Sequence, residues 1–167
     1  MKVESERSLT RPIKRIVVVD DGSTFHDLIN EKFYWPLVDA LQKRLSDLGI
    51  ESRSVTLDKK ALNPGDAISK SLQESGARHV LFVQLTRVRS SDPNKASALL
   101  SGVFISEYSL SFVIRDAGIE KNIWKANVEA GRGHTGSKQE IEEIMDKLEV
   151  ELLIAGLAVP PYKKRPD

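Results

Sequence analysis

The chain has 167 residues, of which 40% are hydrophobic, 29% are charged and none is cysteine. The absence of cysteine excludes a disulfide framework, a thiolate zinc site and a cysteine nucleophile. With 25 Lys and Arg residues against 24 Asp and Glu, the net charge is +1, which gives no electrostatic basis for binding nucleic acid or a membrane surface. The length and composition therefore predict one globular α/β domain.

The two ends of the chain are polar. We expect residues 1–13 to be a flexible arm, residues 14–159 a single domain and residues 160–167 a flexible, Pro-rich and basic tail. The arm has no apolar signal-peptide core, and no stretch reaches the roughly 18–20 apolar residues that a membrane helix needs. Two interpretations stay open: a cytoplasmic protein, or one whose leader and lipid-bearing cysteine have been removed.

The first half of the domain alternates strands and helices. A continuous β-branched run at 16–19 predicts a strand buried on both faces. Pro36 predicts a kink or a fresh start in the helical region that follows, and Asn63 and Pro64 mark the start of the next helix. This order favours parallel strands joined by right-handed crossovers. The expected elements are a helix at 25–48, a strand at 51–57, a helix at 64–75 and a strand at 79–88.

The second half changes period. Apolar residues alternate with polar ones at 108–114 and 124–130, which is typical of antiparallel strands with one wet face. Residues 98–106 are either a separate strand or the start of this hairpin with a bulge near Gly102. Ser137 and Glu140 form a capping box for a final helix. The fold class is α/β (α+β), a single mixed sheet of four to five strands in the order βαβαβ(β)βα with helices packed on it.

An acidic pair follows the first buried strand. The string from Val17 to Thr24 resembles the signature of family-2 glycosyltransferases, in which acidic groups at a strand end contact a sugar nucleotide. That family also needs a metal-binding Asp-x-Asp at a later strand end, and residues 84–87 contain no carboxylate. Asp20 and Asp21 are therefore candidate ligand contacts, and nucleotide-sugar binding is the alternative function.

A glycine-rich loop at 131–136 precedes the final helix. Backbone N–H groups of such a loop, next to a helix N-terminus, can bind a phosphate, with His134 beside it. The loop lacks a P-loop lysine, and a plain connector is the competing interpretation. The three histidines are scattered and form no metal-binding pattern. We assign no catalytic residue, no metal and no cofactor.

Two further groups are candidate partner contacts. The aromatic cluster before Pro36 includes Tyr34 and Trp35, part of which we expect to anchor the kinked helix to the sheet. Arg87 and Arg89 lie at the end of the third strand. Residues 89–107 form a long Ser-rich stretch, and loops on a rigid scaffold often carry function.

The layout as a whole resembles the small α/β domain of bacterial periplasmic lipoproteins, of the TolB amino-terminal, curli-secretion and penicillin-binding-protein activator types. The segments that carry this resemblance are the helix ending Leu41, Leu45, Leu48 and Gly49, the strand region 75–85, the hairpin segments 109–116 and 123–126, and the ending Leu157-Ala158-Val159-Pro160-Pro161. The turn has Asp116-Ala117-Gly118 where the family has D-x-x-T-G. The family has no shared catalytic residues to carry over.

The resemblance implies a function. We expect a non-enzymatic module of the cell envelope that binds another envelope protein or itself. It implies the periplasm or the inner face of the outer membrane if a leader was removed, with membrane contact only through the lost lipid anchor. Without a leader the protein is cytoplasmic.

Overall fold

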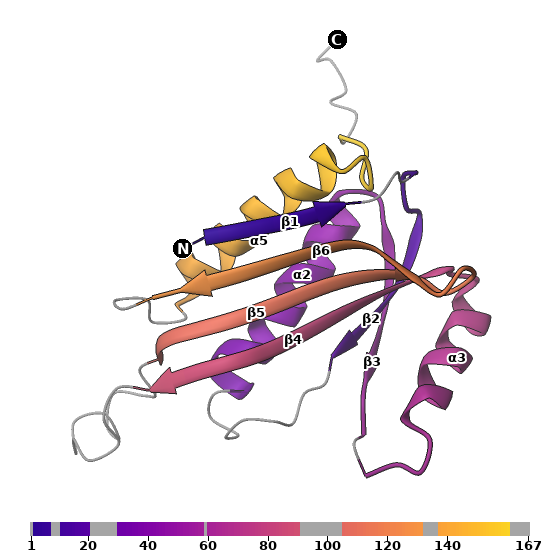
Figure 1. The fold of residues 1–167 in the computed structure, drawn as a ribbon, viewed down its shortest axis with the longest axis horizontal. Coiled ribbons are helices and arrows are strands. Elements are labelled where there is room, and N and C mark those ends of the chain that lie inside the picture. Colours follow the sequence, from indigo (N-terminus) through magenta and orange to yellow (C-terminus); the bar gives the residue numbers. More distant parts are fainter. Residues whose placement is uncertain are drawn as a thin grey trace.

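The computed structural model describes residues 2–7, 11–20, 30–58, 60–90, 105–131 and 137–160. Figure 1 shows the strands and helices of this part of the chain. The strands are β1 (Lys2–Arg7), β2 (Arg15–Asp20), β3 (Glu51–Thr56), β4 (His79–Ser90), β5 (Ile105–Asp116) and β6 (Lys121–Ala130). The helices are the π-helical turn η1 (Asn30–Tyr34), α2 (Trp35–Asp47), α3 (Pro64–Ser75) and α5 (Lys138–Ile154).

The strands form one mixed sheet in the order β1-β6-β5-β4-β2-β3. β2 pairs parallel with β3 and β4, whereas β4, β5, β6 and β1 pair antiparallel in succession. The expected fold class is confirmed, but the sheet has six strands and not four or five. The additional strand is β1, which lies in the segment expected to be a flexible arm. Its six residues pair in register with β6. This backbone pairing makes the segment a strand, although its polar sequence does not predict one.

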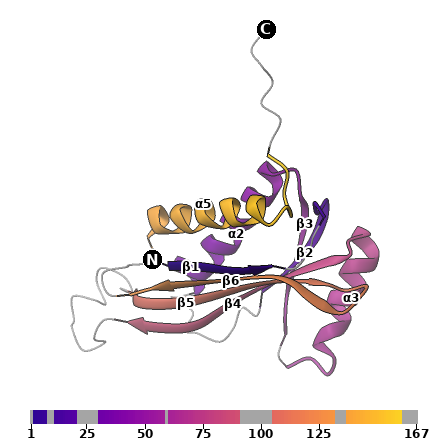
Figure 2. The same cartoon turned by 45° about the horizontal axis from the view of Figure 1, so that its top comes forward.

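The parallel half of the sheet is covered on both faces (Figure 2). Val18 belongs to the large core under α2. Val17, Val19 and Val80 form a second cluster on the other face, against Ile68 and Leu72 of α3. Crossovers in opposite directions put the two helices on opposite faces. The continuous apolar run of β2 is therefore explained, because successive side chains of a strand point to opposite faces and both faces are buried here.

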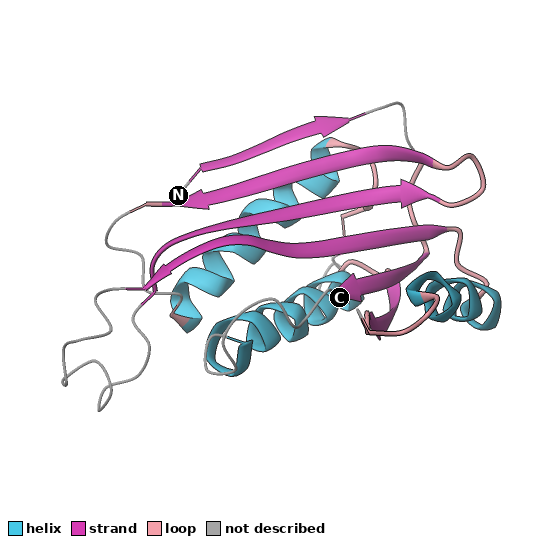
Figure 3. Cartoon of the chain, turned by 60° about the horizontal axis from the view of Figure 1, so that its bottom comes forward, coloured by secondary structure: helices cyan, strands magenta, loops and turns pink. Residues whose placement is uncertain are grey.

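In the part of the chain that the structure describes, helices cover only one face of the antiparallel half. Leu110, Phe112 and Ile114 of β5 are buried in the core beneath α2 and α5, and the residues between them are partly exposed. In Figure 3 the opposite face of β1, β6, β5 and β4 comes forward, and both α2 and α5 lie behind the strands. The alternating sequence pattern is confirmed by this one-sided burial. We call the other side of the four strands, over which none of the described helices lies, the open face.

The turn η1 ties the start of α2 to the sheet. Phe33 is buried against Tyr108, with 4.7 Å between the ring centroids. The hydroxyl of Tyr34 donates a 2.9 Å hydrogen bond to the carbonyl of Val83 in β4. α2 begins at Trp35, directly after η1, with Pro36 in its first turn, so the helix changes type where the sequence predicts a kink or a fresh start. The expected helix at 25–29 and the bulge near Gly102 lie outside the described residues.

α5 closes the core face. The Ser137 hydroxyl caps it by accepting a 3.3 Å hydrogen bond from the backbone N–H of Glu140. Three carboxylates of α5 meet one guanidinium of α2: Arg44 lies within 2.6–3.2 Å of Glu142, Asp146 and Glu149. The hydrogen bond to Glu149 leads the causes that raise the pKa of Arg44 above its usual value. This contact fixes α2 and α5 side by side.

Candidate functional site

Asp20 ends β2 at the carboxyl edge of the parallel strands, where open α/β sheets usually bind ligands. Its side chain is not presented to solvent, since the residue is only 1% exposed. One carboxylate oxygen accepts a 3.1 Å hydrogen bond from the hydroxyl of Thr56 in β3, and the Asp20 carbonyl accepts one from Leu57 N–H at 2.8 Å. Asp20 therefore ties the end of β2 to the end of β3. Asp21 lies outside the described residues.

Arg87 and Arg89 lie on the open face, at the end of β4. A bulge between Leu85 and Arg87 shifts the register of β4 against β5 by one residue. As a result, Leu85 is buried in the core and both arginines lie on the opposite face. Both guanidinium groups approach Glu107 of β5, at 3.7 Å from Arg87 and 3.4 Å from Arg89. The two arginines therefore lie together, as the sequence predicted, and the single carboxylate of Glu107 balances one of their two positive charges.

A small hollow of about 260 Å³ adjoins this cluster. Its lining includes Glu129, Ala130 and Gly131, where the expected glycine-rich loop begins. Asp20 is not among the lining residues, so the described structure does not bring Asp20 and the start of this loop to one pocket. His134 and the rest of the loop, 132–136, lie outside the described residues.

The two aromatic candidates behave differently. Tyr34 is 2% exposed and bonded to Val83, so it anchors the helix start and presents no surface to a partner. Trp35 is partly buried against the core, with its ring 5.3 Å from that of Tyr34. We expected part of this cluster to anchor the helix to the sheet, and Tyr34 does so. The side chain of Trp35 is partly exposed.

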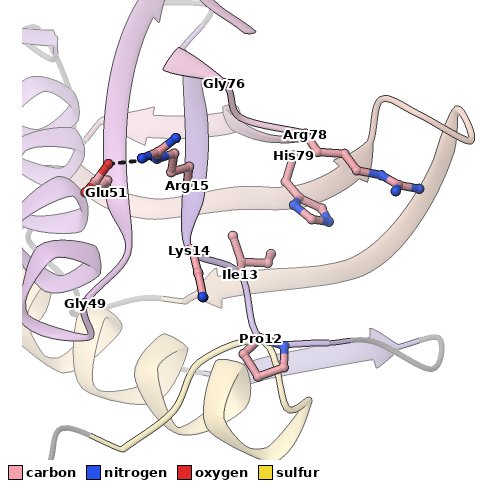
Figure 4. A pocket seen from close by; sticks show the side chains of 9 residues that line it. All are labelled: Pro12, Ile13, Lys14, Arg15, Gly49, Glu51, Gly76, Arg78 and His79. Carbon is pink, nitrogen blue, oxygen red and sulfur yellow. Dashed lines mark hydrogen bonds and ion pairs between the residues drawn. The ribbon is translucent and has the colours of Figure 1, made fainter.

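A larger hollow of about 690 Å³ lies at the amino ends of β2, β3 and β4 (Figure 4). Lys14 and Arg15 project from the start of β2, Arg78 and His79 from the start of β4, and Gly49 and Gly76 follow the last residues of α2 and α3. Helix C-termini carry partial negative charge, and the positive charges of Lys14, Arg15 and Arg78 offset it. Arg15 is also paired with Glu51 at 3.0 Å. We interpret this hollow as the place where two helices end, and not as a ligand site.

Beside this hollow, Asp116 secures the β5–β6 hairpin. Its carboxylate accepts hydrogen bonds from the Arg78 guanidinium and the Gly118 N–H, each 2.8 Å long. The Arg78 hydrogen bond holds the pKa of Asp116 below its ordinary value. Burial lowers the pKa of the neighbouring His79, against the opposing effect of Asp116. The Asp116-Ala117-Gly118 turn, which differs from the D-x-x-T-G pattern of the similar family, is thus held by the hydrogen bonds of Asp116.

Neither a metal site nor a membrane span emerges from the described residues. No group of three or more His, Asp or Glu side chains among them is arranged to hold a metal ion. Within the same residues, no helix is both long and apolar enough to cross a membrane.

Sequence reasoning missed β1 and the Arg44 cluster. β1 contains one apolar residue, Val3, so neither periodicity nor propensity marks it. The Arg44 cluster had a signal: Glu142, Asp146 and Glu149 are spaced by four and three residues, which puts them on one face of a helix. Their common partner on another helix was not visible in the sequence.

Comparison with known proteins identifies the fold but no family. No family model matches the chain, and no curated protein matches it. Among solved structures, the dodecamer of a PelC point variant from Paraburkholderia phytofirmans aligns with a TM-score of 0.56 and 14% identity, over 95% of this chain and 100% of that one. A second PelC dodecamer from the same organism gives 0.54 and 13%, with the same coverage. The lipoprotein GNA1162 from Neisseria meningitidis gives 0.48 and 14%, over 86% and 99%.

These identities show a shared fold and nothing about activity. The alignment spans 95% of this chain and all of the PelC chain, so the two domains are of similar size. The layout predicted from the sequence is thus one that solved bacterial proteins adopt.

Proposed function

We propose that this chain is a non-enzymatic assembly module of the bacterial cell envelope that associates with further copies of itself. The observation that carries the proposal is the fold shared over the full length of PelC, which was solved as a dodecamer. The described part of this chain offers several surfaces for assembly: two sheet edges, an open sheet face and an outer helix layer.

The geometry of the candidate residues supports an assembly role over a catalytic one. Asp20 bonds Thr56, the two arginines share Glu107, and Asp116 bonds Arg78. These groups lie at separate places on the sheet and each has a structural partner. A reaction centre needs several such groups to converge within hydrogen-bond reach of one substrate.

The envelope location and the N-terminal lipid anchor rest on the sequence resemblance to periplasmic lipoproteins. Self-association is proposed ahead of a different envelope partner, because the PelC dodecamers suggest it.

The test is the mass of the purified chain in solution, measured by light scattering and sedimentation over a hundredfold range of concentration. We expect one dominant species whose mass is a whole-number multiple, two or more, of the 18.6 kDa monomer. A chain that stays monomeric up to the highest concentration, with an intact unfolding transition, would contradict the proposal.

A further inference from the structure

The six-stranded sheet has two edge strands, β1 and β3. Each has six residues. β3 runs parallel to β2 and hence to β4, and three successive antiparallel pairings separate β4 from β1. β1 therefore runs opposite to β3. Two such edges from different copies can pair antiparallel.

The hydrogen bonds fix which backbone groups of β3 point outward. Glu51 and Leu57 donate to β2, to the carbonyls of Lys14 and Asp20. Because successive residues of a strand direct their backbone groups to opposite sides, the residues of even number point away from β2. The outward residues of β3 are Ser52, Ser54 and Thr56.

The same alternation can be followed to β1. Ala117 donates to the carbonyl of Arg78, which makes these two residues a hydrogen-bonded pair of the β4–β5 ladder. The alternation continues through the registers of β5 with β6 and of β6 with β1. It directs the backbone N–H and C=O groups of positions 2, 4 and 6 toward β6. The outward positions of β1 are therefore Val3, Ser5 and Arg7.

The outward positions of β1 and the outward residues of β3 both belong to the face of the sheet that carries α2 and α5. Position 5 is in register with buried Ala126, and Ser54 is in register with Val18 of the large core. Directly opposite residues of paired strands share a face, so joined copies keep α2 and α5 on one side. Neither strand contains proline, and their registers with β6 and β2 show no bulge. Natural edges are often blunted by these two devices.

We propose that β1 of one copy pairs antiparallel with β3 of the next, so that the sheet continues through the assembly. This inference rests on the proposed self-association and specifies its interface. The contact is heterologous, joining two different surfaces, and contacts of this kind close into rings when the rotation between copies permits. The occupant of each edge is thus a second copy of this chain.

Charge selects the register. Two registers keep the faces matched and pair five residues of each strand: Ser5 opposite Ser54, or Ser5 opposite Ser52. The first sets Glu6 opposite Arg53, whose half-exposed side chain already pairs with Glu74 of α3 at 2.8 Å and would bridge both carboxylates. The second sets Glu6 opposite Glu51 instead, while Glu4 faces Arg53. Like charges directly opposite are destabilising, so the Ser5–Ser54 register is favoured.

Because the chain contains no cysteine, introduced cysteines report this contact without background. We would make the double variant Ser5→Cys/Ser54→Cys, the register control Ser5→Cys/Ser52→Cys and the three single variants. All would be oxidised mildly and separated without reductant. A disulfide needs Cα atoms about 4.4–6.8 Å apart. The edges of one copy are about 24 Å apart at ~4.8 Å per strand, so a bond between them joins two copies.

We expect the Ser5→Cys/Ser54→Cys variant to give a ladder of dimers, trimers and higher species, at least tenfold more than the register control. The single variants should stay uncrosslinked. A stronger ladder from the control overturns the register, and efficient dimers from a single variant overturn the heterologous contact. Absence of crosslinks in a chain that light scattering shows to be oligomeric overturns the edge pairing alone. A monomeric chain overturns the proposed function as well.

Discussion

The two halves of the sheet bury their side chains by different rules. In the parallel half, neighbouring residues Val17 and Val18 are both fully buried, because α3 covers one face and α2 the other. In the antiparallel half, Phe112 is fully buried while its neighbours Ser111 and Val113 are partly exposed. Crossover connections bring a helix to each face of the parallel half, whereas the described helices cover only one face of the antiparallel half. The open face follows from this difference.

The largest expected effect tests the one-sided burial of β5. Phe112→Ala should lower the free energy of unfolding by about 3–5 kcal/mol, because it removes a large side chain from a packed core. The matched variant Val113→Ala, on the open face, should cost less than about 1 kcal/mol. Chemical denaturation measures both. Similar losses from the two variants would mean that something covers the open face in the isolated chain.

In the parallel half the same comparison should give no contrast. Val17→Ala and Val18→Ala should each cost about 1–3 kcal/mol, since each deletes buried methyl groups. The decisive quantity is the difference between the two unfolding free energies, which we expect to be small. If Val17→Ala were nearly neutral, α3 would not form a second core.

A third pair tests the anchor between α2 and β4. Tyr34→Phe should cost about 1–2 kcal/mol, because the buried carbonyl of Val83 loses its side-chain donor. Tyr108→Phe is the control, since its buried hydroxyl has no hydrogen-bond partner among the described residues. That change should be close to neutral. Equal costs for the two hydroxyl deletions would contradict the role given to Tyr34.

The smallest effect concerns pH at the β5–β6 turn. The folded-state pKa of Asp116 is lowered chiefly by the Arg78 hydrogen bond, so its contribution is present above the unfolded pKa and is lost as the pH falls through the folded pKa. Asp116→Asn should therefore be less stable than the unaltered chain at pH 7, and the difference should shrink toward pH 3. Thermal unfolding at several pH values measures it. A constant difference would show that the charge of Asp116 is not involved.

The sequence allowed the core of the fold to be predicted, because its signals are local. The apolar run of β2, the alternation in β5 and β6, and the glycines after α2 and α3 each identify an element and the faces it buries. β1 was not predictable, since Lys2–Arg7 has no apolar period and becomes a strand only by pairing with β6.

The candidate site was less accessible for the same reason. Residue type marked Asp20, Arg87 and Arg89 as chemically capable groups, but not their partners. Thr56 and Glu107 lie 36 and 18–20 residues away in sequence, and the sheet register alone brings them into contact. The partner of a charged residue decides whether the residue can bind a ligand or only holds the fold together. That partner is known only from the tertiary structure.

The most direct test of edge-to-edge assembly is the solution mass of Ser54→Pro beside that of Ser54→Ala. The N–H of Ser54 points away from β2, so proline removes an outward donor and leaves the β2–β3 ladder intact, as edge strands tolerate. Both variants should keep the far-UV circular dichroism and unfolding transition of the unaltered chain. We predict that Ser54→Ala stays oligomeric and that Ser54→Pro falls to the monomer mass of 18.6 kDa. A folded Ser54→Pro variant with the full oligomeric mass would contradict the account.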